Sequence, residues 1–156
     1  MDHSQLDAIL MYRNENVISR FTDMFSVSPV EAEEIFQETL KFLYLCPLPG
    51  TFIPDELLII DEMWHNFILF TKDYQSFCNT HFGQYLHHLP ASKHEKEQQE
   101  RISKEDPEKA AADFNGRLKT FMESVFDHLG KETLLRWFTV YPQVYSKEII
   151  KALRKC

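Results

Sequence analysis

Side chains that can bind a metal ion or act as a nucleophile are concentrated in one stretch near the middle of this chain. Five of the seven histidines and one of the three cysteines lie between positions 65 and 94. They are His65, His81, His87, His88, His94 and Cys78. The rest of the chain consists mainly of core and helix-forming residues, so any chemistry is predicted to lie in this stretch.

Asp61 and His65 are four residues apart in a segment that is predicted to be helical, so they lie on the same helical face. The carboxylate can accept a hydrogen bond from an imidazole N–H, which sets the tautomer of the ring and raises its basicity. The same two side chains can instead both bind one metal ion. The sequence leaves both possibilities open.

Tyr74, Cys78 and His81 share one face of the next predicted helix, because they stand at positions i, i+4 and i+7. His87 and His88 follow that helix and can close over the same space. A thiolate together with imidazole rings is a donor set that zinc favours, with copper and iron as further candidates.

These patterns predict a divalent-metal site, with zinc as the expected ion. If a coordination position stays open, a bound water can be activated for hydrolysis. The expected ligands or orienting residues are His65, His88, Cys78 and Asp61, and the expected pocket residues are Trp64, Tyr74 and His87.

Two other functions fit the same residues. In a non-catalytic protein–protein interaction module, they would only buttress a helix junction. In a thiol enzyme, Cys78 would be the nucleophile, His65 the base and Asp61 the orienting group. Against the thiol enzyme, Cys78 lies near the predicted C-terminal end of its helix, where the helix dipole disfavours a thiolate.

The elements that position these residues are all predicted to be helices. Apolar residues recur with a period of 3.6, and no alternating pattern with a tight turn suggests a β-hairpin. The pattern predicts a single-domain bundle of six to seven helices, at about residues 4–25, 29–45, 55–70, 71–81, 108–129, 132–138 and 146–153. Ser28, Asp55, Thr71 and Ser146 are the predicted N-caps, and Gly83 the predicted left-handed C-terminal residue.

Residues 91–109 differ from the rest, because they are rich in Lys, Glu and Gln and almost free of apolar side chains. This segment is predicted to be a solvated loop or an exposed helix. Tyr141 and Pro142 are predicted to separate the last two helices.

Composition limits the classes of protein that are possible. A chain of 156 residues with 44% hydrophobic residues suits one globular domain, residues 1–156. The net charge of −7 argues against a nucleic-acid partner, and the lack of a long apolar run argues against a membrane span. Three widely spaced cysteines, Cys46, Cys78 and Cys156, suit reduced thiols in a cytoplasmic protein. The partner is expected to be a protein or a small molecule of unknown identity.

The spacing of Asp61, Trp64, His65, Tyr74, Cys78, Gly83 and His88 resembles the motif of the glycine-rich domain-containing protein-like family. The resemblance covers about Asp55 to Pro90. It implies a helical domain without an established activity. Relatives often carry a second histidine where this chain has Phe67, and an acidic residue where it has Leu89. His87 is the residue that can compensate for this difference.

Overall fold

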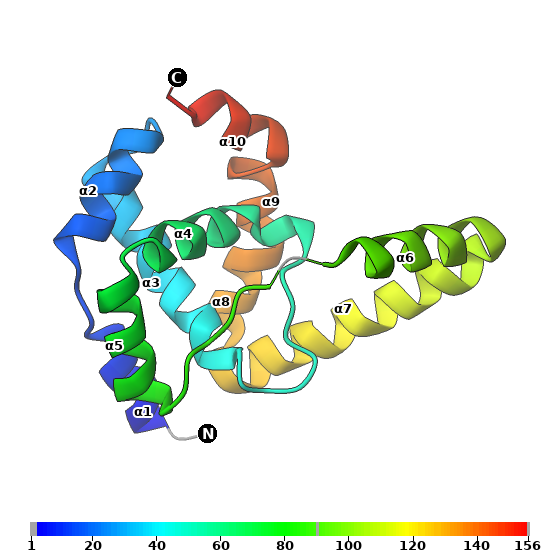
Figure 1. Ribbon diagram of the computed structural model, residues 1–156, viewed down its shortest axis with the longest axis horizontal. Coiled ribbons are helices and arrows are strands. Elements are labelled where there is room, and N and C mark those ends of the chain that lie inside the picture. Colours follow the sequence, from blue (N-terminus) through cyan, green and yellow to red (C-terminus); the bar gives the residue numbers. More distant parts are fainter. Residues whose placement is uncertain (1–2, 90, 156) are drawn as a thin grey trace.

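The computed structural model of the protein describes residues 3–89 and 91–155. Pro90, at the end of the motif stretch, and Cys156 lie outside the described residues. Within these two ranges the chain is helical, with no β-strand and one isolated antiparallel bridge between Phe25 and Arg154 (Figure 1). The all-α prediction is confirmed, although the described residues form more helices than the six to seven expected.

The helices follow one another along the chain without an intervening sheet. They are α1 (His3–Leu10), α2 (Glu15–Met24), α3 (Pro29–Leu45), the 3₁₀ turn η1 (Asp55–Leu57), α4 (Leu58–Ile68), α5 (Thr71–Phe82), α6 (Lys93–Glu105), α7 (Pro107–Leu129), α8 (Lys131–Leu135), the π-helical turn η2 (Arg136–Val140), α9 (Tyr141–Val144) and α10 (Lys147–Leu153). Among the described residues, no helix combines the length and the apolar content that crossing a membrane requires.

The N-terminal segment forms two helices rather than the single helix that its periodicity predicts over residues 4–25. That prediction is wrong because residues 11–14 interrupt the helix. The Asn14 side chain accepts hydrogen bonds from the backbone N–H groups of Asn16 and Val17, and so begins α2. Apolar periodicity continues across the break because both α1 and α2 pack against α3.

The central helix α3 begins as its sequence predicts, with Ser28 as N-cap and Pro29 in the first turn. It contacts α1, α2, α4 and α7, and most of its second half is buried. Its buried Glu38 carboxylate accepts a hydrogen bond of 2.9 Å from Trp137 Nε1 and pairs with Lys41 Nζ at 3.0 Å. These contacts attach the C-terminal helices to the core.

Two of the predicted helix starts near the motif differ from the structure. Asp55 begins the 3₁₀ turn η1, and α4 starts only at Leu58. Thr71 is the first residue of α5, and the N-cap position belongs to Phe70, which makes no side-chain cap. The C-terminal prediction for α5 is confirmed, because Gly83 adopts the left-handed conformation with φ of 66°. This turn sends the following loop back toward α4.

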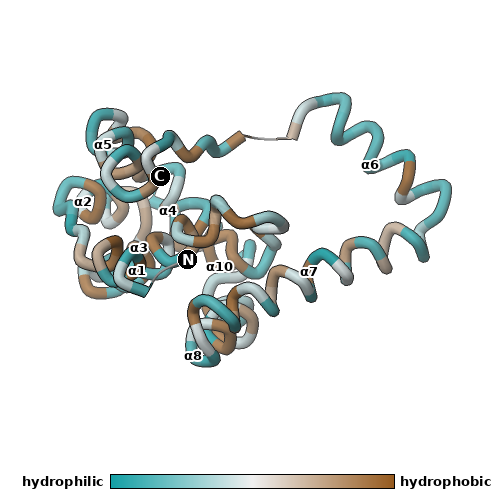
Figure 2. Tube along the Cα trace, turned by 90° about the horizontal axis from the view of Figure 1, so that it is seen from below, coloured by the Kyte–Doolittle hydropathy of each residue, from teal (hydrophilic) through white to brown (hydrophobic). Residues whose placement is uncertain are grey.

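Helices α6 and α7 form a hairpin that projects from the rest of the molecule (Figures 1 and 2). Most of the charged segment 91–109 forms the exposed helix α6. Of the two predicted alternatives, a solvated loop or an exposed helix, the exposed helix is the one observed. A capping box of Ser92 and Glu95 begins α6, and Asp106 caps α7. The base of α7 joins the core through Phe121 and Val125, both buried.

The C-terminal region is more continuously helical than predicted. Tyr141 and Pro142 do not separate two helices but begin the short helix α9, in which Pro142 occupies an early position that needs no N–H donor. Ser146 caps α10, as predicted, by accepting a hydrogen bond from Ile149 N. The chain end then returns to α2, where Ser26 N donates to Leu153 O at 2.8 Å.

Candidate metal site and adjoining cavity

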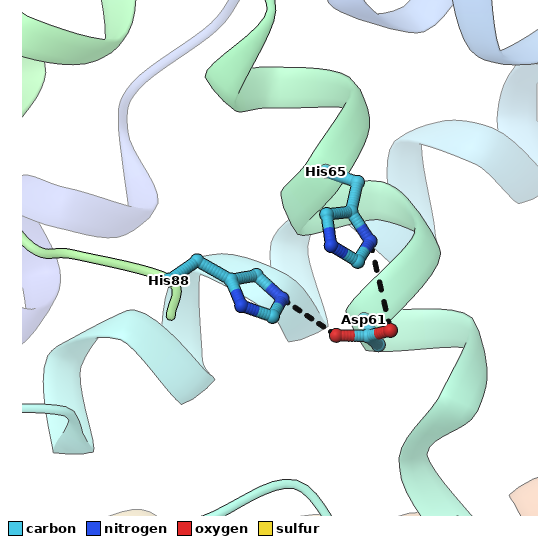
Figure 3. A group of neighbouring side chains, drawn as sticks. All are labelled: Asp61, His65 and His88. Atoms are coloured by element: carbon cyan, nitrogen blue, oxygen red, sulfur yellow. Dashed lines mark hydrogen bonds and ion pairs between the residues drawn. The ribbon is translucent and has the colours of Figure 1, made fainter. Parts of the chain in front are cut away.

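Asp61, His65 and His88 form a cluster at the exposed side of α4 (Figure 3). His88 Nε2 lies 2.6 Å from Asp61 Oδ1, and His65 Nδ1 lies 3.6 Å from Asp61 Oδ2. One ligand atom from each of the three side chains can be chosen so that all lie within 4.8 Å of one another. Each oxygen of the Asp61 carboxylate thus faces a different imidazole ring.

Two members of the cluster come from one helix. Asp61 and His65 are one turn apart on α4, and their side chains lie on the same face, as the spacing predicts. The side chain of His65 is 56% exposed, whereas that of Asp61 is 24% exposed. His65 is therefore accessible from solvent, while the carboxylate sits deeper at the base of the cluster.

The third member is brought in by the loop after α5. The Trp64 indole Nε1–H donates to the Tyr74 hydroxyl at 2.9 Å, and that hydroxyl donates to the Leu86 carbonyl at 2.5 Å. All three residues are buried. The hydrogen-bonded chain links α4, α5 and the loop, and so it positions His88, which stands two residues after Leu86.

The ring of His88 lies between two other rings. Its centroid is 4.1 Å from that of Trp64 and 4.2 Å from that of His65, with an angle of 18° between the two imidazole planes. The His88 side chain is only 15% exposed. This packing restricts rotation of the ring and keeps Nε2 directed at Asp61.

Cys78, a predicted ligand, lies elsewhere. It is fully buried on α5, and among the described residues the cluster does not include it. Burial raises the pKa of its thiol, opposed in part by hydrogen bonds with the Leu86 backbone and the Tyr74 hydroxyl. Since a nucleophile must be exposed and ionised, these properties favour a structural role for Cys78 over the thiol-enzyme hypothesis.

A cavity of about 430 Å³ adjoins the cluster. Asp61, Trp64, His87 and His88 contribute to its wall, so these predicted site residues meet there, whereas Tyr74 lies behind Trp64. The remaining wall consists of Phe42, Cys46, Thr51, Phe52, Ile53, Leu58 and Leu89.

Sequence reasoning missed the part of this wall that comes from residues 51–53. These residues lie in a loop between α3 and η1. Loop residues have no periodicity that would indicate which side chains face a cavity. The prolines and glycine at positions 47–50 and 54 mark the loop but not its contact with the site.

The three clustered side chains suit a divalent cation chemically. Neutral imidazole nitrogens with one carboxylate oxygen are a donor set that occurs in catalytic zinc sites and in non-haem iron sites. Without the thiolate of Cys78, the donor set is less soft than the sequence alone indicates.

One of the comparisons with known proteins gave a match, to a protein-family model. A family model described as UCP032817-like matches residues 12–105, which is more than half of the chain and includes the whole cluster. Comparisons with curated proteins and with solved structures gave no match. The glycine-rich name suggested by the motif is not the description that the matching family carries. From the extent of this match, the chain belongs to the UCP032817-like family.

Proposed function

We propose that this helical domain binds one divalent metal ion, with zinc as the first candidate, through Asp61, His65 and His88. The observation that carries the proposal is the convergence of their ligand atoms within 4.8 Å, from two segments held together by a buried hydrogen-bonded chain. Fe²⁺ suits the same donors and is the second candidate.

Binding requires only a local adjustment. Zinc takes nitrogen and oxygen ligands at about 2.0–2.2 Å, so the direct contact of 2.6 Å between His88 Nε2 and Asp61 Oδ1 has to open to admit the ion. His65 is exposed and can turn toward the ion by side-chain rotation. The Trp64 ring and the anchored Leu86 carbonyl keep the rest of the site in place.

Three protein ligands are the pattern of a catalytic rather than a structural zinc site, because a fourth position stays available for water or substrate. Asp61 and His88 also line the cavity, so this position can be reached by a small molecule. On these grounds we propose hydrolytic chemistry, in which the bound ion supplies a water of lowered pKa.

The first test measures the metal content of protein purified without chelator and without a metal-affinity step. We expect about one zinc per chain after addition of zinc, measured by elemental analysis and by calorimetric titration. A content below about 0.2 per chain that added zinc does not change would remove the proposal. Titration with Fe²⁺ under anaerobic conditions ranks the two candidate ions.

Substitutions identify the ligands. Asp61→Asn, His65→Ala and His88→Ala should each weaken zinc binding by at least about tenfold. His94→Ala is the matched control, because His94 is exposed on α6 and belongs to no cluster among the described residues. Equal affinity of all four variants would show that zinc binds elsewhere.

A second candidate is the non-catalytic interaction module, and one observation favours it: the direct contact of 2.6 Å between His88 Nε2 and Asp61 Oδ1 joins the loop to α4. If the domain is such an interaction module, zinc should not change its melting temperature. In a metal site, zinc raises the melting temperature of the parent protein and not that of His65→Ala, because an ion that binds only the folded state stabilises it. Thermal unfolding with and without zinc separates the two.

A further inference from the structure

The cavity beside the cluster has an uneven distribution of polar groups. Among the described residues that line it, Asp61 is the only carboxylate, and there is no lysine or arginine. Phe42, Phe52 and Leu58 belong to its apolar wall. Thr51 Oγ1 already donates to the Leu45 carbonyl, so the polar side chains that can recognise a ligand are mainly Asp61, His87 and His88, two of which belong to the metal cluster.

The charge of this cluster depends on the metal. A divalent ion held by one carboxylate and two neutral imidazoles leaves a net charge of +1, and no other acidic side chain in the described wall neutralises it. A net positive charge beside apolar walls is stabilised by an anionic ligand, because the low local dielectric strengthens the attraction. A cationic ligand would be repelled.

We propose that the cavity binds a small organic monocarboxylate, with its carboxylate at the metal end and its apolar part against the aromatic wall. This inference rests on the proposed function, because the metal supplies the positive charge. The volume of about 430 Å³ lies within the range of about 300–1,000 Å³ that is usual for small-molecule pockets. Leu89, which is 79% exposed in the wall, would be partly covered by the apolar part.

His87 is the residue that distinguishes this ligand site from the metal site. It lines the cavity but lies outside the metal cluster, and its ring packs against Tyr85 at a centroid distance of 4.8 Å. An imidazole N–H at this place can donate to a carboxylate oxygen of the ligand. We therefore assign His87 as a positioning residue for the carboxylate.

The experiment uses three probes that share a benzyl group and differ in charge, phenylacetate, phenylacetamide and benzylamine. Each is titrated by calorimetry into zinc-loaded and zinc-free protein, and changes in tryptophan fluorescence provide a second readout. We expect phenylacetate to bind the zinc-loaded form at least about tenfold more tightly than the zinc-free form. Benzylamine should show the opposite order.

His87→Ala removes the N–H donor and should leave the zinc affinity unchanged while weakening phenylacetate binding by about three- to tenfold, the effect of one hydrogen bond. His87 is exposed, so this substitution should not disturb folding. His94→Ala is the matched control and should change neither affinity.

The outcomes separate the two proposals. Zinc binding at one ion per chain, with no preference for phenylacetate over phenylacetamide, would overturn the monocarboxylate site and leave the metal site intact. Absence of zinc binding would overturn the metal site and the ligand proposal with it. A loss of zinc affinity in His87→Ala would place His87 among the metal ligands and refute its assignment to the carboxylate.

Discussion

The buried hydrogen-bonded chain from Trp64 through Tyr74 to Leu86 depends on a single atom, the hydroxyl oxygen of Tyr74, so one substitution can test it. The Tyr74 hydroxyl accepts from the indole N–H and donates to the Leu86 carbonyl. Burial is the main reason that the pKa of this hydroxyl is raised, so it stays protonated and can keep donating. Tyr74→Phe removes the hydroxyl and retains the ring.

The expected loss of stability follows from the groups left behind. The Trp64 N–H and the Leu86 carbonyl are both buried, and an orphaned buried polar group costs about 1–3 kcal/mol. The nearby Cys78 thiol has hydrogen bonds with the Leu86 backbone and the Tyr74 hydroxyl, but a thiol is too weak a donor to replace the lost hydroxyl. Together these contributions predict a decrease of about 2–4 kcal/mol in the free energy of unfolding.

Urea unfolding followed by circular dichroism measures this decrease. Tyr85→Phe is the matched control, because Tyr85 is partly exposed and contacts the Tyr74 ring at 5.2 Å through its own ring, which phenylalanine preserves. The control should change stability by less than about 0.5 kcal/mol. Tyr74→Phe should also weaken zinc binding by about tenfold, because Leu86 no longer anchors the loop that carries His88.

A loss below about 0.5 kcal/mol for Tyr74→Phe, equal to that of the control, would refute the role of the hydroxyl. A loss of about 3 kcal/mol with unchanged zinc affinity would refute only the coupling between the buried chain and the site.

Three further predictions concern Glu38, which is buried, and Cys46 and His81, which are partly buried. Glu38→Ala should lower the free energy of unfolding by about 2–4 kcal/mol, because it leaves the Trp137 N–H without its acceptor and removes the ion pairs of Glu38 with Lys41 and Arg136; urea unfolding that matched the parent would contradict this. Burial raises the pKa of the Cys46 thiol from 9.0 to about 12, so stability is full below pH 9 and falls above it as the unfolded thiol ionises, by up to about 1.4 kcal/mol per pH unit. Cys46→Ala should make this alkaline decrease smaller when thermal unfolding is measured between pH 8 and 11. Identical pH profiles of the variant and the parent would show that the Cys46 thiol does not cause the decrease. Burial lowers the pKa of His81 below 6.5, so the unfolded state takes up the proton first and the free energy of unfolding falls as the pH drops below 6.5. His81→Asn should make this decrease smaller. An unchanged slope of the free energy of unfolding against pH would contradict this role of His81.

Local signals predict much of the helical structure. Ser28 with Pro29, Ser146 and Gly83 mark helix ends through contacts within a few residues, and all four behave as their types indicate. The pairing of Asp61 with His65 is equally local, because a single helical turn places both on one face.

Local signals fail where two explanations fit the same pattern. Apolar periodicity through residues 11–14 hides the cap at Asn14, since separate helices that pack on the same partner keep the same periodicity. Pro142 predicts a break between two helices, yet proline is equally compatible with the first turn of a helix. Only the packing of α9 against η1 and η2 decides between a break and a helix start.

By itself, the sequence determined the helical class, several helix ends and the residue types available for a metal site near α4. Only the tertiary structure decided which of them meet. His88 approaches Asp61 because a tyrosine hydroxyl on one helix holds a carbonyl of the loop, and Cys78 is buried in the core near the backbone of the same loop residue. Such contacts join residues far apart along the chain and depend on how α4 and α5 pack, which no local spacing specifies.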